Sequence, residues 1–160
     1  YYILFMEIRF GPAGLGGVKD AGEVLVDYHK KGFRACEIAF TYGVYIKPKD
    51  AEWIWKKAKE LDISLSSHGS YFVNLNAIDK KKVEASKKRI LDACEIGEIL
   101  GAKRVVFHPG YYGKDREGAY DNIKNNIIDI MKTLKIWSIN CFINILLEIW
   151  AERAASEWAR

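Results

Sequence analysis

The sequence predicts an α/β fold built on a parallel β-sheet. Short apolar runs alternate with longer segments whose apolar residues recur every three or four positions, in units of about thirty residues. Parallel strands need helical crossovers, and this order fits two architectures: a doubly wound open sheet or part of an eight-stranded barrel. A complete barrel takes about 250 residues, so the 160 residues of this chain would form a little over half of one.

Five short apolar stretches, each bounded by loop residues, are the predicted strands. They cover residues 7–10, 34–40, 63–67, 103–107 and 142–147. The glycine-rich segment 11–17 follows the first strand. It lacks the Lys-Ser/Thr of a P-loop, so we expect a plain strand-to-helix loop there.

Four helices are predicted, one between each pair of successive strands. Asp20 and Glu23 form a capping pair at the start of the first helix, and Gly32 ends it as a left-handed cap. The others are predicted from their apolar periodicity over residues 49–61, 79–100 and 117–134.

Composition indicates an ordinary globular protein. Hydrophobic residues make up 49% and charged residues 29% of the chain, and the net charge of +4 permits phosphate contacts without arguing for them. The three cysteines (Cys36, Cys94 and Cys141) form no C-x-x-C motif, which favours reduced core thiols in a cytoplasmic protein. The uncharged run 136–147 is too short to span a bilayer, so we expect no membrane partner.

We expect a single domain over residues 6–160. Met6 resembles a natural start, which would make the apolar pentad 1–5 an extra segment. After Lys135 the chain becomes richer in bulky apolar residues, and three of its five tryptophans lie there. A truncation or frameshift would produce such a stretch, so residues 136–160 are expected to be aberrant.

The histidines are the chief candidates for chemistry. His68 and His108 each stand where an apolar run ends and a glycine-containing loop begins, whereas His29 lies among charged residues of a predicted helix and is expected at the surface. Glu148 follows the fifth strand. Because parallel strands end at the same edge of a sheet, His68, His108 and Glu148 could converge, and such a set suits zinc, with manganese or iron as alternatives.

Two segments around these histidines resemble a known family. His68-Gly-Ser-Tyr-Phe-Val-Asn-Leu is similar to the His-x-Ser-Tyr-x-x-Asn-Leu segment of the endonuclease IV family of apurinic/apyrimidinic endonucleases. Phe107-His-Pro-Gly-Tyr-Tyr-Gly resembles the second signature of that family, and Phe10-Gly-Pro-Ala-Gly resembles its first loop. The resemblance covers about residues 6–134.

The resemblance implies a partial (β/α)8 TIM barrel of about five strands that uses zinc to cleave DNA on the 5′ side of abasic sites, as a DNA repair enzyme. It makes His68 and His108 metal ligands, and Glu148 a metal-bridging and catalytic residue. Ile149-Trp-Ala-Glu departs from the glycine-bearing loop that the family has after that glutamate. Tyr71 matches a residue that contacts double-stranded DNA near the lesion. We expect Tyr42 and Tyr111, in neighbouring loops, to contact DNA as well.

Two alternatives remain open from the sequence. Sugar isomerases and epimerases share the barrel superfamily and also use strand-end His and Glu residues with a divalent metal, in which case Glu37 and Glu148 would hold the metal or move a proton. The chain could also be a non-catalytic half-barrel that associates through its open edge. The remaining ligands of the endonuclease family fall beyond residue 160. We therefore expect one weakly bound zinc ion and little nuclease activity.

Overall fold

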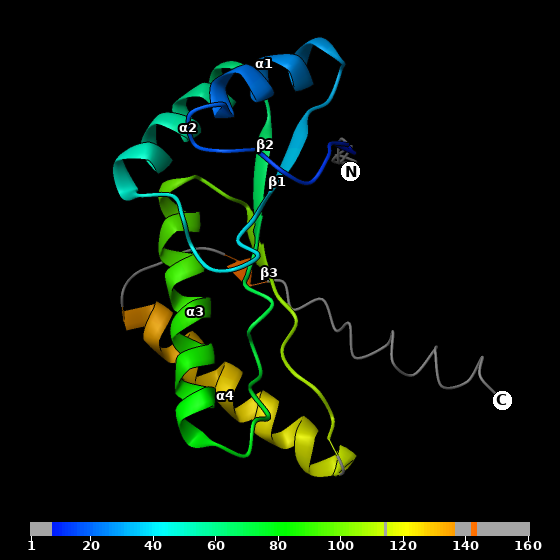
Figure 1. Ribbon diagram of the computed structural model, residues 1–160, viewed down its shortest axis with the longest axis vertical. Helices are drawn as coiled ribbons and strands as arrows, with labels where there is room; N and C mark the ends of the chain where they lie inside the picture. The colour runs from blue at the N-terminus through cyan, green and yellow to red at the C-terminus, as the bar shows by residue number, and fades with distance from the viewer. Residues whose placement is uncertain (1–7, 114, 137–141, 144–160) are drawn as a thin grey trace, which may run out of the picture.

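A computed structural model describes residues 8–113, 115–136 and 142–143 (Figure 1). Helices and strands alternate along the chain, which confirms the α/β prediction. The elements in chain order are α1 (Ala21–Lys30), β1 (Ala35–Ala39), α2 (Pro48–Glu60), β2 (Ser64–His68), α3 (Lys80–Ile99), β3 (Arg104–Val106), α4 (Arg116–Ile136) and β4 (Phe142–Ile143).

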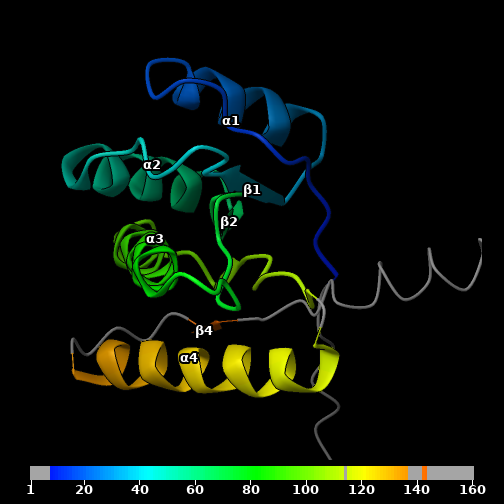
Figure 2. The same cartoon turned by 60° about the horizontal axis from the view of Figure 1, so that its bottom comes forward.

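The four strands form one parallel sheet in the order β1-β2-β3-β4, so that neighbours in the sheet are also neighbours in the chain. A doubly wound sheet reverses its strand order at a switch point, and the described strands show no such reversal. Figure 2 shows the four helices one below another in the same chain order. This arrangement is an arc of a barrel and excludes the doubly wound alternative for this part of the chain.

The two faces of the sheet differ in burial. In β1, Cys36 and Ile38 are buried while Glu37 is half-buried, and β2 repeats the alternation with Leu65 and Ser67 on the buried side. The side carrying the buried residues packs against the helices and is called the covered face. The opposite side, which carries Glu37 and its register partner Ser66, is called the open face.

The core lies between the covered face and the helices. The buried positions of α2 are Ala51, Ile54 and Ala58, at spacings of three and four as the sequence predicts. Successive helices pack against one another, and both α2 and α3 pack against β2. None of the helices in the described residues is long and apolar enough to cross a membrane.

The predicted first strand over residues 7–10 is wrong for the part that the structure describes. Residues 8–10 form no strand, and the chain pairs with β1 slightly later, through one isolated parallel bridge between Ala13 and Glu37. Phe10 and Pro12 accept backbone hydrogen bonds from β1, but Pro12 has no N–H to donate in return. Gly11 passes so close to the carbonyl of Ala35 that a Cβ atom would overlap it, so the contact is made by backbone alone.

The other predicted boundaries are close to the observed ones. The strand expected over 103–107 is only Arg104–Val106, because the chain turns toward a loop after Val106. Of the strand expected over 142–147, the structure describes Phe142–Ile143 paired with β3. The domain limits and the segments 1–5 and 144–160 lie outside the described residues and stay expectations.

Candidate metal centre

His68 is the last residue of β2 and its side chain is half-buried. Its Nδ1 atom lies 2.9 Å from the carbonyl oxygen of Gly69. Because a carbonyl oxygen only accepts hydrogen bonds, Nδ1 is the donor in this contact, and Nε2 is the ring nitrogen left to coordinate a metal. Histidine ligands of metals are commonly oriented in this way, with one ring nitrogen bound to a carbonyl and the other free to coordinate.

His108 stands on the same side of the sheet, two residues beyond the end of β3. His68 is the register partner of Val106, and side chains two residues apart along extended chain share a face. Phe107, between Val106 and His108, is buried in the core on the covered face. His108 therefore lies on the open face. The prediction that the two histidines project from the same edge of a parallel sheet is therefore supported by the register.

Each histidine has a tyrosine beside it, three residues further along the chain. The ring centroids of His68 and Tyr71 are 6.2 Å apart in an edge-to-face arrangement, and those of His108 and Tyr111 are 5.1 Å apart. Tyr71 and Tyr111 are 66% and 53% exposed. Large exposed rings at the end of a strand are free to contact a ligand on their outer side.

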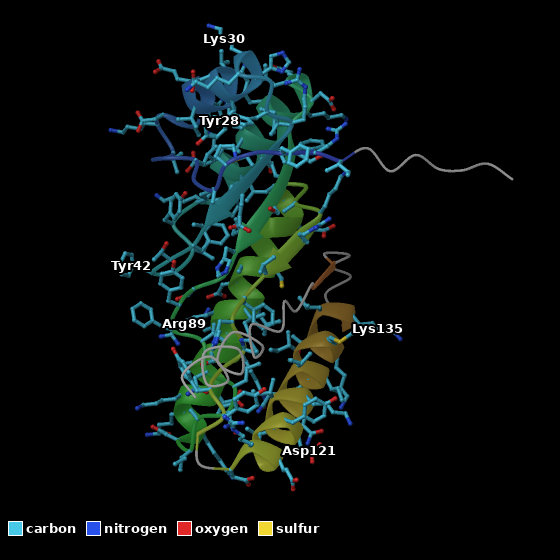
Figure 3. All side chains as sticks on the ribbon, turned by 90° about the vertical axis from the view of Figure 1, so that its right-hand side faces the viewer. Tyr28, Lys30, Tyr42, Arg89, Asp121 and Lys135 are labelled. Carbon is cyan, nitrogen blue, oxygen red and sulfur yellow. The ribbon has the colours of Figure 1, made fainter. Side chains whose placement is uncertain are left out.

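Two further aromatic residues extend this surface. Tyr42, in the loop after β1, is 84% exposed and lies 6.2 Å from Phe72 in ring-centroid distance. Figure 3 shows Tyr42 projecting away from the ribbon. The four exposed rings at the carboxyl ends of the strands are called the aromatic rim: Tyr42, Tyr71, Phe72 and Tyr111.

The loops that carry the rim are fixed to one another by backbone hydrogen bonds. Gly69 N–H donates to the carbonyl of Val106, and Leu75 N–H donates to that of Pro109. The loop after β2 is also joined to the loop after β1, where Tyr71 N–H donates to Thr41. The histidine positions are thus set by the loops as well as by the strands.

Sequence reasoning missed the asparagines that complete these connections. Asn76, Asn122 and Asn126 hydrogen-bond to one another or to the loop backbone, and link the loop after β2 to α4. The only signal in the sequence was the four-residue spacing of Asn122 and Asn126, which places both on one side of a helix. The partner in the other loop could not be read from one chain.

Two imidazole ligands would supply half of a tetrahedral zinc set, which takes four ligands. The described residues contain no cluster of three or more His, Cys, Asp or Glu side chains that could hold a metal ion. Glu148, the predicted third ligand, lies outside the described residues and stays a prediction. Among the described carboxylates, Glu37 shares the open face with the two histidines.

The remaining candidates are accounted for by structure. His29 is half-buried, less exposed than expected, and its Nδ1 lies 2.8 Å from the carbonyl oxygen of Leu61, which joins α1 to the end of α2. Since a carbonyl only accepts, the ring donates in this bond. Cys36 and Cys94 are buried, as expected for core cysteines. Burial raises the pKa of the Cys36 thiol to about 11, which keeps it protonated and unreactive.

Strand–helix units wound in consecutive order, with polar side chains gathered at the carboxyl ends of the strands, define a (β/α)-barrel protein. A family model described as xylose isomerase-like TIM barrel matches residues 26–156. The chain belongs to this xylose isomerase-like TIM barrel family.

Two curated relatives illustrate the range of the family. An uncharacterized protein of Methanocaldococcus jannaschii is 37% identical over 138 residues, which are 84% of this chain and 49% of that protein. The apurinic-apyrimidinic endonuclease of Caenorhabditis elegans is 36% identical over 70 residues, which are 40% of this chain and 18% of that protein. The chain thus spans about half the length of the archaeal relative and less of the nematode one.

Solved structures confirm the fold. A D-tagatose 3-epimerase-like protein superposes with a TM-score of 0.69 at 20% identity, covering 86% of this chain and 52% of that one. Endonuclease IV from Thermus thermophilus gives a TM-score of 0.67 at 21% identity, covering 86% and 51%. At such identities the likeness shows a shared barrel and no shared activity.

Proposed function

We propose that this chain forms part of a zinc-dependent endonuclease of the endonuclease IV type, which cleaves double-stranded DNA on the 5′ side of abasic sites. The observation that carries the proposal is the arrangement at two adjacent strand ends. His68 and His108 stand on the same open face, and each lies beside an exposed tyrosine.

The two histidines support the metal part of the proposal. The free Nε2 of His68, fixed by the bond from Nδ1 to Gly69, suits zinc, and manganese or iron would also accept imidazole. Glu148 is proposed as a third ligand and as the residue that acts on the attacking water. With only His68 and His108 in place, we expect one zinc ion held weakly, since half of the usual ligand set is supplied.

The aromatic rim supports DNA as the substrate. A phosphodiester site needs groups that position the nucleic acid as well as groups that do the chemistry, and exposed tyrosines can stack on bases or wedge beside an unpaired one. Tyr71, Tyr42 and Tyr111 are proposed for this role. A relative named apurinic-apyrimidinic endonuclease favours the abasic site as the feature that is recognised.

The chemistry required is hydrolysis of a poorly electrophilic phosphodiester. When bound, zinc neutralises phosphate charge and lowers the pKa of a coordinated water. The residues of this chain would contribute the remainder: His68 and His108 would hold the metal from two neighbouring strand ends, and Tyr71 and Tyr111 lie beside the imidazoles. The aromatic rim would hold the abasic nucleotide against this edge.

Replacing each histidine by glutamine tests the metal site. We expect His68→Gln and His108→Gln each to weaken zinc binding by about tenfold or more, measured by competition with a chromogenic chelator. His29→Gln is the matched control, because its amide can still donate to Leu61 and the residue lies on α1. Equal zinc affinity in all four proteins would overturn the metal assignment.

A second function has one observation in its favour. Glu37 lies on the open face, and its register partner Ser66 is two residues before His68. A carboxylate on the same face as two imidazoles could help to hold a metal or move a proton in a sugar isomerase or epimerase. The endonuclease is preferred because the Ser-Tyr-x-x-Asn segment that follows His68 resembles that of the endonuclease family.

Substrate comparison separates the two functions. The zinc-loaded chain should retard an abasic-site duplex in a binding assay more than an intact duplex, and the triple change of Tyr42, Tyr71 and Tyr111 to serine should remove that preference. Turnover of a ketose that depends on Glu37 would instead establish the isomerase or epimerase. No zinc and no preference for either ligand would favour the non-catalytic half-barrel.

A further inference from the structure

We propose that Asn76 is a positioning residue that fixes His108 relative to His68. The proposal rests on the proposed metal site, and it concerns a side chain that follows the His-x-Ser-Tyr-x-x-Asn-Leu segment rather than one within it. The side-chain link between the two histidine loops passes through its carboxamide, in addition to the backbone bond from Leu75 to Pro109.

Both polar atoms of the Asn76 carboxamide make hydrogen bonds. Its Nδ2 donates to the carbonyl oxygen of Tyr111 at 2.8 Å and to that of Tyr112 at 3.2 Å, both in the loop after β3. Its Oδ1 accepts a bond of 3.0 Å from Nδ2 of Asn122 on α4. Because both loop partners are carbonyls, only the amide nitrogen can face them, so the orientation of the side chain is unambiguous.

The backbone of Asn76 is held as firmly as its side chain. Its N–H donates to Oδ1 of Asn74 at 3.0 Å, which closes a local turn. Next to it, the carbonyl of Leu75 accepts a bond of 2.9 Å from Nδ2 of Asn126. The loop after β2 is therefore anchored to α4 before it reaches across to the loop after β3.

The loop segment to which Asn76 bonds lies directly beside His108, the candidate metal ligand. Asn76 holds the main chain at Tyr111, and the ring of Tyr111 lies 5.1 Å from the ring of His108. Removing the two donors would free the main chain at residues 111–112 and, with it, the ring that packs on the imidazole. His68 would keep its own bond to Gly69. The expected effect is therefore confined to one of the two histidines.

This asymmetry can be measured without metal. In Asn76→Asp the carboxylate has nearly the same shape but cannot donate to Tyr111 or Tyr112. We expect the ring signals of His108 in nitrogen-15 NMR spectra of the metal-free chain to shift or broaden, while those of His68 stay unchanged. Zinc affinity should fall by about tenfold, the range found for residues that orient metal ligands.

Asn126→Asp is the matched control. It makes the same chemical change and also removes an amide donor to a loop carbonyl, but its partners are Leu75 and Asn122 and not the loop of His108. Its His108 signals should match those of the unmodified chain. Identical spectra and zinc affinities for Asn76→Asp and Asn126→Asp would overturn the proposal.

Two further results keep the inference separate from the proposed function. If zinc binding does not depend on His68 and His108, the metal assignment fails, yet the NMR comparison still decides whether Asn76 positions His108. If Asn76→Asp does not fold, Asn122→Asp removes only the bond to Asn76 Oδ1 and should shift the His108 signals by less. Unshifted signals in that folded variant would count against the proposal.

Discussion

The two faces of the same strands carry different tasks. On the covered face Ile38 and Val105 are fully buried against helices, whereas on the open face Glu37 and His68 keep part of their surface in contact with solvent. Adjacent residues of one strand therefore lie on opposite faces. The residues that stabilise the fold and the residues proposed for chemistry thus lie on opposite sides of a single β-sheet, so substitutions of neighbouring residues should have unlike effects.

The largest expected difference is between Ile38 and Glu37. Ile38→Ala removes a fully buried side chain and leaves a cavity, at a cost of about 2–5 kcal/mol in the free energy of unfolding. Glu37→Gln, its neighbour on the open face, should change stability by less than about 1 kcal/mol. Urea denaturation of both variants measures the difference. Equal losses would refute the division between the faces.

A smaller loss is expected where the histidine loops meet. Gly110 has φ +145°, and a Cβ atom there would lie 2.7 Å from Oδ1 of Asn74. We expect Gly110→Ala to cost about 1–3 kcal/mol through backbone strain and this clash. Gly113→Ala is the control, since φ is also positive but the nearest side-chain atom is 4.0 Å away. A Gly110 variant no less stable than the Gly113 variant would show that the loop junction is loose.

At Ser67, unlike at other positions of the covered face, we expect a substitution to stabilise the fold. Its hydroxyl is fully buried, and no hydrogen-bond partner for it exists among the residues that the structure describes. Because an unsatisfied buried hydroxyl is destabilising, Ser67→Ala should raise the free energy of unfolding by about 1 kcal/mol. Ser66→Ala, on the open face, should have no such effect. Thermal unfolding of the two variants measures the difference. If Ser67→Ala is the less stable variant, the Ser67 hydroxyl has a hydrogen-bond partner, and the prediction is wrong.

The smallest effect is expected at the opposite end of the strands, in the pair formed by Arg9 and Asp62. The guanidinium of Arg9 donates to the carboxylate at 2.9 Å and lowers the pKa of Asp62. A carboxyl whose pKa is lower in the folded state stabilises the fold above its unfolded pKa, about 3.9, and loses that contribution as the pH falls further.

Asp62→Asn should therefore lower the unfolding midpoint slightly at pH 6 and have a smaller effect at pH 3. Asparagine tolerates the positive φ of 51° at this position, so backbone strain should not confuse the comparison. Arg9→Gln should remove the same pH-dependent component, measured by urea denaturation at both pH values. If the difference in unfolding midpoint between Asp62→Asn and the unmodified chain grows toward pH 3, the stabilising role of the Arg9–Asp62 pair is contradicted.

The covered face was the more predictable of the two from sequence. Apolar periodicity located α1 to α4 within a few residues, because burial of one helix side leaves a repeat of three and four. The first strand was placed wrongly, since the run before Gly11 is apolar enough to suggest a strand, yet only its last residue, Phe10, bonds to β1, and the parallel bridge forms later, at Ala13. A close approach between two main-chain segments cannot be recognised from the hydrophobic pattern of the sequence.

The open face was predicted only in part. His68 and His108 could be found because each follows an apolar run and precedes a glycine-containing loop. The contacts of Asn76 could not be found, because its partner Asn122 is 46 residues away and an asparagine in a loop is ordinary. Side-chain bonds across such distances depend on where the loops come to lie, which a single sequence does not specify.

The consecutive order of the strands also bears on synthesis of the chain. When β2 and α3 leave the ribosome, the surface on which they pack, β1 with α2, is already complete, and the same holds for β3 after β2. Pairing partners lie 29 residues apart between β1 and β2 and 38 apart in the other two strand pairs, which keeps the entropy of loop closure low. The sheet can therefore be assembled in the direction of translation, one strand–helix unit at a time, without waiting for a distant strand.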